Sequence, residues 1–235
     1  MKEREIDEVL AQAAKDSPAV SPALLASIAD SIKPTLRPVR PMPPAWLLTA
    51  GLLSIAAAIA LAGAARAGLY GIERLTVFER ALIFPALVLL LWASAAEFTA
   101  SMIPGSRRRM HPGALSAISC LALMGVFVGV FRDDHTTHFV SAGIACLVAG
   151  LLHAIPVALL SWLLLRRGFA VNAVAAGAVA GTLAGLAGVT MLELHCPNFQ
   201  VLHVLVWHTA VVPVAGAAGA LLAWTLQLKA RLSER

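Results

Sequence analysis

Thiol and imidazole side chains gather in one part of this chain of 235 residues. Cys196 directly follows His195, and His203 and His208 come soon after it, whereas Cys146 lies fifty residues earlier. Thiolate and imidazole together suit zinc, copper and related soft ions. The two cysteines could instead form a disulfide in an oxidising compartment. The sequence therefore offers two candidate sensing residues, Cys146 and Cys196, and five candidate metal ligands when the three histidines are added.

The spacing of these residues is not that of a known metal motif. His203 and His208 are five residues apart, which predicts that they leave a common face of an α-helix. Histidines are also common where a chain meets water, so the loops could contain them without binding an ion. His153 shares a helical face with Cys146 deep in an apolar segment. It is either a functional group or, as we favour, a neutral imidazole that bonds a serine or a backbone group of a neighbouring helix.

Six apolar segments must position these side chains. The chain is 59% hydrophobic and 13% charged, whereas soluble domains are typically about half apolar and about a quarter charged. A membrane-spanning helix needs about 20 apolar residues. The predicted spans cover roughly 46–65, 81–102, 114–131, 139–165, 170–192 and 204–228. The expected fold is all-α, a polytopic six-helix membrane bundle with a short cytoplasmic N-terminal helical arm.

Positive charge predicts the orientation of these spans. With the N-terminus inside, 14 of the 18 lysines and arginines fall on the inner side. The positive-inside rule then places both termini in the cytoplasm, across a bacterial inner membrane. The net charge of +5 is explained by these short basic loops, so no nucleic-acid partner is expected. The cysteine and histidine set falls near the outer face.

Residues 1–32 have the composition of a partner-binding arm. They carry six acidic and three basic side chains. Apolar residues recur at helical spacing in two short stretches, namely Ile6, Val9 and Leu10, then Leu24, Leu25 and Ile28. Helices this short cannot bury a core of their own, so we expect docking to a partner protein; an inert tail or helices lying on the lipid surface are the alternatives. A proline-rich basic linker, 33–45, joins the arm to the membrane domain, 46–228, and residues 229–235 form a cytoplasmic tail.

The spans themselves contain little that could perform chemistry. Gly177, Gly181 and Gly185 fall on one face of the fifth span, which predicts close helix packing. Glu97 lies near the inner end of the second span, and we expect no other charged residue within the spans, which argues against an ion-coupled transporter. No hydrolase, phosphate-loop or zinc-protease motif occurs, so an enzyme is not expected.

The C-terminal half resembles the NrsF-type family of membrane anti-sigma factors, six-span proteins that restrain extracytoplasmic-function sigma factors in proteobacteria. The matching residues are Cys146-Leu147, Arg166-Arg167-Gly168, Gly181-x3-Gly185, Leu194-His195-Cys196-Pro197-Asn198, His203 and Trp207-His208. The resemblance implies that the N-terminal arm holds the sigma factor at the membrane, and that Cys146 and Cys196 sense stress. Cys120 has no counterpart in this pattern and is interpreted as a packing residue.

The expected function is therefore that of an anti-sigma factor which releases its sigma factor on metal or oxidative stress. A signal at Cys146 and Cys196 would shift the fourth span against the fifth and sixth, and so alter how the arm is presented. No cofactor is required; a zinc-like, cadmium-like or copper-like ion is a candidate signal. The expected partners are the sigma factor and the lipid bilayer, with a homo-oligomer left open. The rival hypotheses are a transporter for a metal or small solute and a membrane thiol oxidoreductase.

Overall fold

The protein divides into two compact units, Met1–Met42 and Pro43–Arg235. The structure is a computed structural model, which describes residues 8–9, 11–12, 21–35, 43–103, 105–106, 109–132, 138–166, 168, 170 and 172–233. The division between the units lies within the predicted linker, 33–45. Ile6 and Leu10, two of the predicted partner-binding residues, lie outside the described residues.

The first unit contains the helix α2, Pro22–Ile32, followed by the short 3-10 helix η1, Lys33–Thr35. Ser21 precedes α2 and Pro22 takes its first position, where the missing N–H of proline costs nothing. No residue of α2 is buried. The described residues of the arm therefore bury no core of their own.

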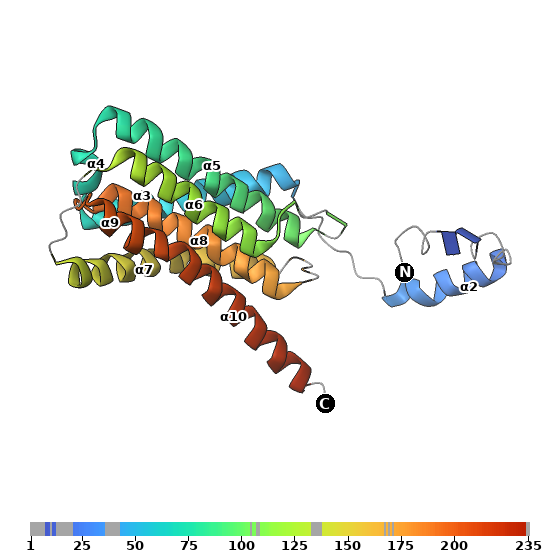
Figure 1. Cartoon of the computed structure of the whole chain (residues 1–235). Helices are drawn as coiled ribbons and strands as arrows, with labels where there is room; N and C mark the ends of the chain where they lie inside the picture. Colours follow the sequence, from blue (N-terminus) through green and yellow to red (C-terminus); the bar gives the residue numbers. More distant parts are fainter. Residues whose placement is uncertain are drawn as a thin grey trace. The chain divides into compact units, whose positions relative to one another are not determined.

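The second unit is a bundle of six helices that are long and apolar enough to cross a membrane. They are α3 (Ala45–Ala67), α5 (Val77–Met102), α6 (Pro112–Val130), α7 (Phe139–Leu165), α8 (Ala173–His195) and the continuous segment Val201–Gln227. That last segment consists of α9 (Val201–His203), the π-helical turn η2 (Val204–His208) and most of α10 (Thr209–Ser233). A short helix, α4 (Tyr70–Arg74), joins α3 to α5 (Figure 1). The predicted all-α, six-span fold is confirmed.

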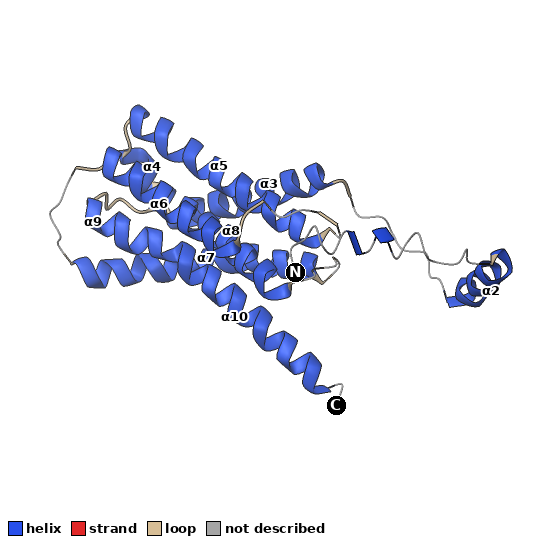
Figure 2. Cartoon of the chain, turned by 45° about the vertical axis from the view of Figure 1, so that its right-hand side comes forward, coloured by secondary structure: helices blue, strands red, loops and turns tan. Residues whose placement is uncertain are grey.

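Helix α8 forms the centre of the bundle, with the other long helices around it (Figure 2). In the apolar 18-residue stretch of α8, 78% of the residues are buried inside the protein. The corresponding stretch of every other span is at most 39% buried. Glycine makes this possible: a Cβ added to Gly185 would lie only 2.8 Å from the Cα of Val212 on α10. The glycine face of the fifth span therefore packs against the sixth, as its spacing predicted.

Several span ends differ from the prediction by three or four residues, and two of these differences have clear consequences. Helix α5 begins at Val77 rather than near residue 81, because Thr76 and Glu79 form a capping box that starts the helix earlier. Helix α8 continues to His195 rather than ending near residue 192. The longer α8 brings Glu193 into the bundle, which bears directly on the candidate site.

Candidate functional site

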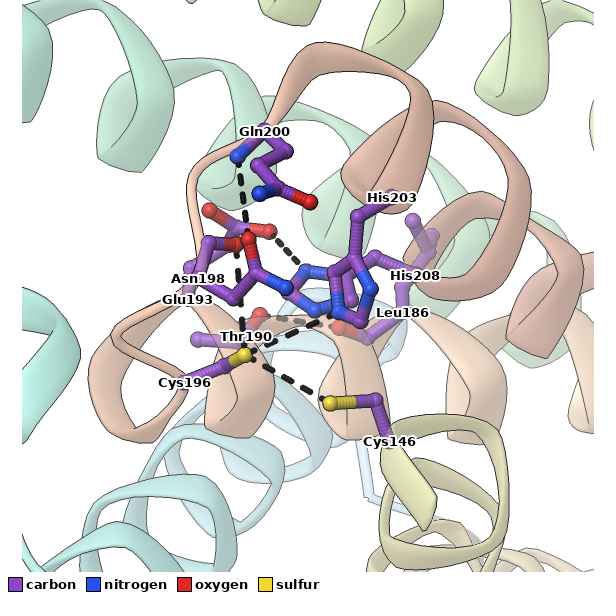
Figure 3. A network of polar contacts seen from close by, with 9 residues as sticks. All are labelled: Cys146, Leu186, Thr190, Glu193, Cys196, Asn198, Gln200, His203 and His208. Carbon is purple, nitrogen blue, oxygen red and sulfur yellow. Dashed lines mark hydrogen bonds and ion pairs between the residues drawn. The ribbon is translucent and has the colours of Figure 1, made fainter. Parts of the chain in front are cut away.

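The two predicted sensing cysteines lie next to each other. Cys196 caps the C-terminal end of α8, where its backbone N–H donates to the Leu192 carbonyl oxygen at 2.7 Å. Cys146 faces it from α7, and their sulfur atoms are 3.4 Å apart (Figure 3). Both residues are free thiols, with Cys196 buried and Cys146 half-buried. The fold thus joins thiols that lie fifty residues apart in the sequence.

A π-helical turn brings His203 and His208 together. In η2, the N–H of Thr209 donates to the carbonyl of Val204, five residues earlier. In such a wide turn, residues five apart come to lie one above the other. The two imidazole rings meet edge to face at 5.3 Å, and both are fully buried. The prediction that these histidines leave a common helical face was wrong, because it assumed an unbroken α-helix.

Glu193 is a member of the site that the sequence analysis missed. Its carboxylate accepts a hydrogen bond from Nδ1 of His208 at 2.6 Å, and both side chains are fully buried. The expectation that Glu97 is the only charged residue within the spans was therefore wrong. Glu97 itself is also buried, and it accepts from the backbone N–H of Arg109. Glu193 lies one helical turn before Cys196 in the sequence, and this spacing could have identified it as a neighbour of the site.

Four of the five candidate ligands come together. Cys146, Cys196, His203 and His208 each offer a ligand atom, and these atoms all lie within 4.8 Å of one another. His195 does not belong to this set: its Nδ1 donates to the Gly68 carbonyl oxygen at 2.8 Å. We call the four residues the Cys2His2 cluster. Its donors suit a soft divalent ion, and its sulfur pair is equally suited to thiol oxidation.

The remaining cysteine and the intramembrane histidine lie elsewhere. Cys120 is half-buried on α6 and packs against the apolar core. His153 contacts the carbonyl oxygen of Ala149, on its own helix, through Nδ1 at 2.8 Å. The contact is with the backbone of its own helix, whereas the sequence predicted a partner on a neighbouring helix.

The surroundings of Cys196 determine its protonation. Its hydrogen bond with Cys146 and its burial raise the pKa of the Cys196 thiol, and the contact with His203 at 3.9 Å only partly opposes this. A thiol with a raised pKa carries its proton at neutral pH. Any ion that binds this sulfur must displace the proton, so protons and metal compete at the site.

Residues 31–227 match the family model NrsF, whose description is "negative regulator of sigma F". The matched region includes all six spanning helices and the whole Cys2His2 cluster. The chain belongs to the NrsF family. No curated protein and no solved structure matches it.

NrsF membership confirms the resemblance found in the sequence and identifies the kind of partner. As an NrsF-family protein, the chain is a negative regulator of a sigma factor. The family match begins at residue 31, so most of α2 lies before it. The NrsF assignment thus rests on the membrane bundle rather than on the arm.

Proposed function

We propose that this chain holds an extracytoplasmic-function sigma factor at the cytoplasmic face of the bacterial inner membrane, and releases it when metal or oxidative stress acts on Cys146 and Cys196. Family membership supports restraint of a sigma factor. The six apolar helices support a membrane location. A sigma factor bound there is kept away from core RNA polymerase.

The exposed apolar face of α2 is the observation that carries this proposal. Leu24, Leu25 and Ile28 remain 54%, 55% and 45% exposed. An apolar helical face without a core is suited to a groove on a partner protein. The acidic residues of the arm would complement the basic surface of a sigma factor.

The Cys2His2 cluster provides the signal input in this proposal. Cys146 belongs to α7, Cys196 follows α8, and the two histidines precede α10. A bond that joins these residues also joins three helices. Because α8 packs tightly against both α7 and α10, a shift at the cluster would be transmitted along the bundle to the arm. The signal acts by favouring one arrangement of these helices over another.

The test is to purify the full-length protein from its native membranes and identify what binds to it. We expect a sigma factor to copurify. Leu25→Asp puts a charge on the apolar face of α2 and should weaken binding by roughly 10- to 100-fold, because burial of a leucine is worth about 1.5–3 kcal/mol. Ala26→Asp puts the same charge on the opposite face of the helix and should bind like the wild type.

Two results would contradict the proposal. If Leu25→Asp and Ala26→Asp bind the sigma factor equally well, the apolar face of α2 is not the docking surface. If no sigma factor copurifies and the protein transports metal into sealed vesicles, the transporter hypothesis is correct instead.

A further inference from the structure

We infer that Cys146, Cys196, His203 and His208 together bind one divalent transition-metal ion of the zinc class, with Glu193 as the residue that positions His208. This inference rests on the proposed function for its regulatory meaning, since it names the signal and its ligands. Under this inference the imidazoles of His203 and His208 are part of the sensor, whereas a sensor based on oxidation would need only the sulfur atoms of the two cysteines.

The geometry of the cluster suits a tetrahedral ion. Zinc–sulfur bonds of about 2.3 Å and zinc–nitrogen bonds of about 2.0–2.1 Å place the ligand atoms of such a site roughly 3.3–3.8 Å apart. In the cluster, Sγ of Cys196 lies 3.4 Å from Sγ of Cys146 and 3.9 Å from Nε2 of His203. Small rotations of the side chains would therefore complete the site (Figure 3).

Unpartnered buried atoms provide a second, independent observation. His208 is fully buried, and with Nδ1 bonded to Glu193 its other ring nitrogen, Nε2, has no hydrogen-bond partner. Buried polar atoms are nearly always paired, because losing water without a replacement costs about 1–3 kcal/mol. A metal ion bound to Nε2 would remove this cost at His208.

Glu193 has the place of an outer partner in a metal site. Metal-binding histidines commonly donate their free ring N–H to a carboxylate, which fixes the ring and makes it a better ligand. The Nδ1–carboxylate contact of 2.6 Å is of this kind. It leaves Nε2 of His208 as the nitrogen that is free to bind.

The charges also balance. The ion replaces the protons of both thiols, so two S–H bonds break, two S–metal bonds form and two protons are released. A divalent ion with two thiolates and two neutral imidazoles carries no net charge. The one remaining charge is that of the Glu193 carboxylate, which is paired through its hydrogen bond with His208, so no isolated charge is left among the apolar helices.

The test is a titration of the reduced, full-length protein in detergent with Co²⁺, followed by displacement with Zn²⁺ or Cd²⁺. We expect one Co²⁺ per chain, with the thiolate charge-transfer absorption and the ligand-field bands of tetrahedral cobalt. Cys146→Ser and Cys196→Ser should lose the charge-transfer band, and His203→Asn and His208→Asn should change the ligand-field bands and weaken binding. His195→Asn is the matched control and should bind like the wild type.

The Glu193→Gln variant tests whether Glu193 positions His208 or binds the metal ion itself. It should bind Co²⁺ about 10- to 100-fold more weakly but with unchanged stoichiometry and the same ligand-field spectrum. The inference is wrong if the reduced wild type does not bind Co²⁺, or if both histidine variants bind as tightly as the wild type. No sigma factor takes part in this titration, so its failure would leave the sigma-factor proposal standing.

Discussion

At the scale of single residues, the sulfur of Cys196 is where three segments of the chain meet. It contacts the Cys146 thiol on α7, Nε2 of His203 and, at 4.0 Å, the carbonyl oxygen of Asn198. The side chain is only 4% exposed, so large reagents cannot reach it directly. Any chemical change at this sulfur must move at least one of the groups around it.

Cys196→Ser should therefore uncouple sensing from binding. The variant keeps the arm, so we expect it to bind the sigma factor as the wild type does. Addition of Cd²⁺ or a thiol oxidant should no longer release the sigma factor, and a sigma-dependent reporter should stay at its uninduced level. Cys120→Ser, which alters a thiol outside the cluster, should respond like the wild type. Normal induction in Cys196→Ser would show that Cys196 is not part of the sensor.

The types of the site residues could be predicted from the sequence, but their arrangement could not. Cysteine and histidine were recognised because few other side chains bind soft ions. The pairing of His203 with His208 depends on a π-helical turn, which no regular helical spacing reveals. Glu193 was missed because the end of the fifth span was placed three residues too early, at 192 rather than 195, and helix ends are the least certain part of such predictions.

At the scale of helices, contact between α8 and α10 depends on the absence of side chains. Gly185 faces the backbone of Val212, and Gly216 faces the hydroxyl of Thr182 across the same interface. The ligands His203 and His208 continue directly into α10, whereas Cys196 ends α8. The packing of α8 against α10 therefore determines the distance between Cys196 and the two histidine ligands.

Gly185→Val should destabilise the bundle and disturb the site. The added carbons would meet the backbone of α10, which cannot move without displacing the helix. Overpacking of this kind costs about 1–3 kcal/mol, so the Tm in detergent should fall and Co²⁺ binding should weaken. Gly125→Val on α6 is the matched control, because an added Cβ there has no neighbour within 4 Å. Equal Tm values for the two variants would show that the α8–α10 contact is not close.

The helices themselves could largely be predicted, since length and apolarity alone define a span. What hydropathy could not reveal is their arrangement. All six spans have mean hydropathies between 1.7 and 2.2, yet α8 is mostly buried and the others mostly face outward. The glycines of α8, namely Gly177, Gly181, Gly185 and Gly188, distinguish it, because they allow the backbones of several neighbours to approach it at once.

At the scale of the whole molecule, the cluster and the start of the membrane domain belong to opposite ends of the bundle. The chain enters α3 at Ala45 and crosses five times before it reaches Cys196. An odd number of spanning helices between them places Cys196 and Ala45 at opposite ends of the bundle. In the proposed function, the signal must therefore cross the bilayer through the helices.

The two ends of α5 provide a direct test of this arrangement. The helix has 26 residues, so at about 1.5 Å per residue it is long enough to cross the membrane. Its first residue, Val77, is 81% exposed, and Arg74 just before it donates to the Pro197 carbonyl oxygen beside the cluster. Ser106, just beyond the other end of α5, is also exposed. These positions suit the test better than Cys196, whose side chain is buried.

In a variant without the three native cysteines, Val77→Cys should react with a membrane-impermeant maleimide in cells whose inner membrane is intact. Ser106→Cys should react only after that membrane is opened, because the positive-inside rule places it in the cytoplasm. The increase in apparent mass on a gel, caused by the attached maleimide, measures both reactions. If Ser106→Cys reacts first and Val77→Cys is protected, the cluster faces the cytoplasm. The protein would then be positioned to sense intracellular ions, and the arm would lie on the wrong side of the membrane to meet a sigma factor.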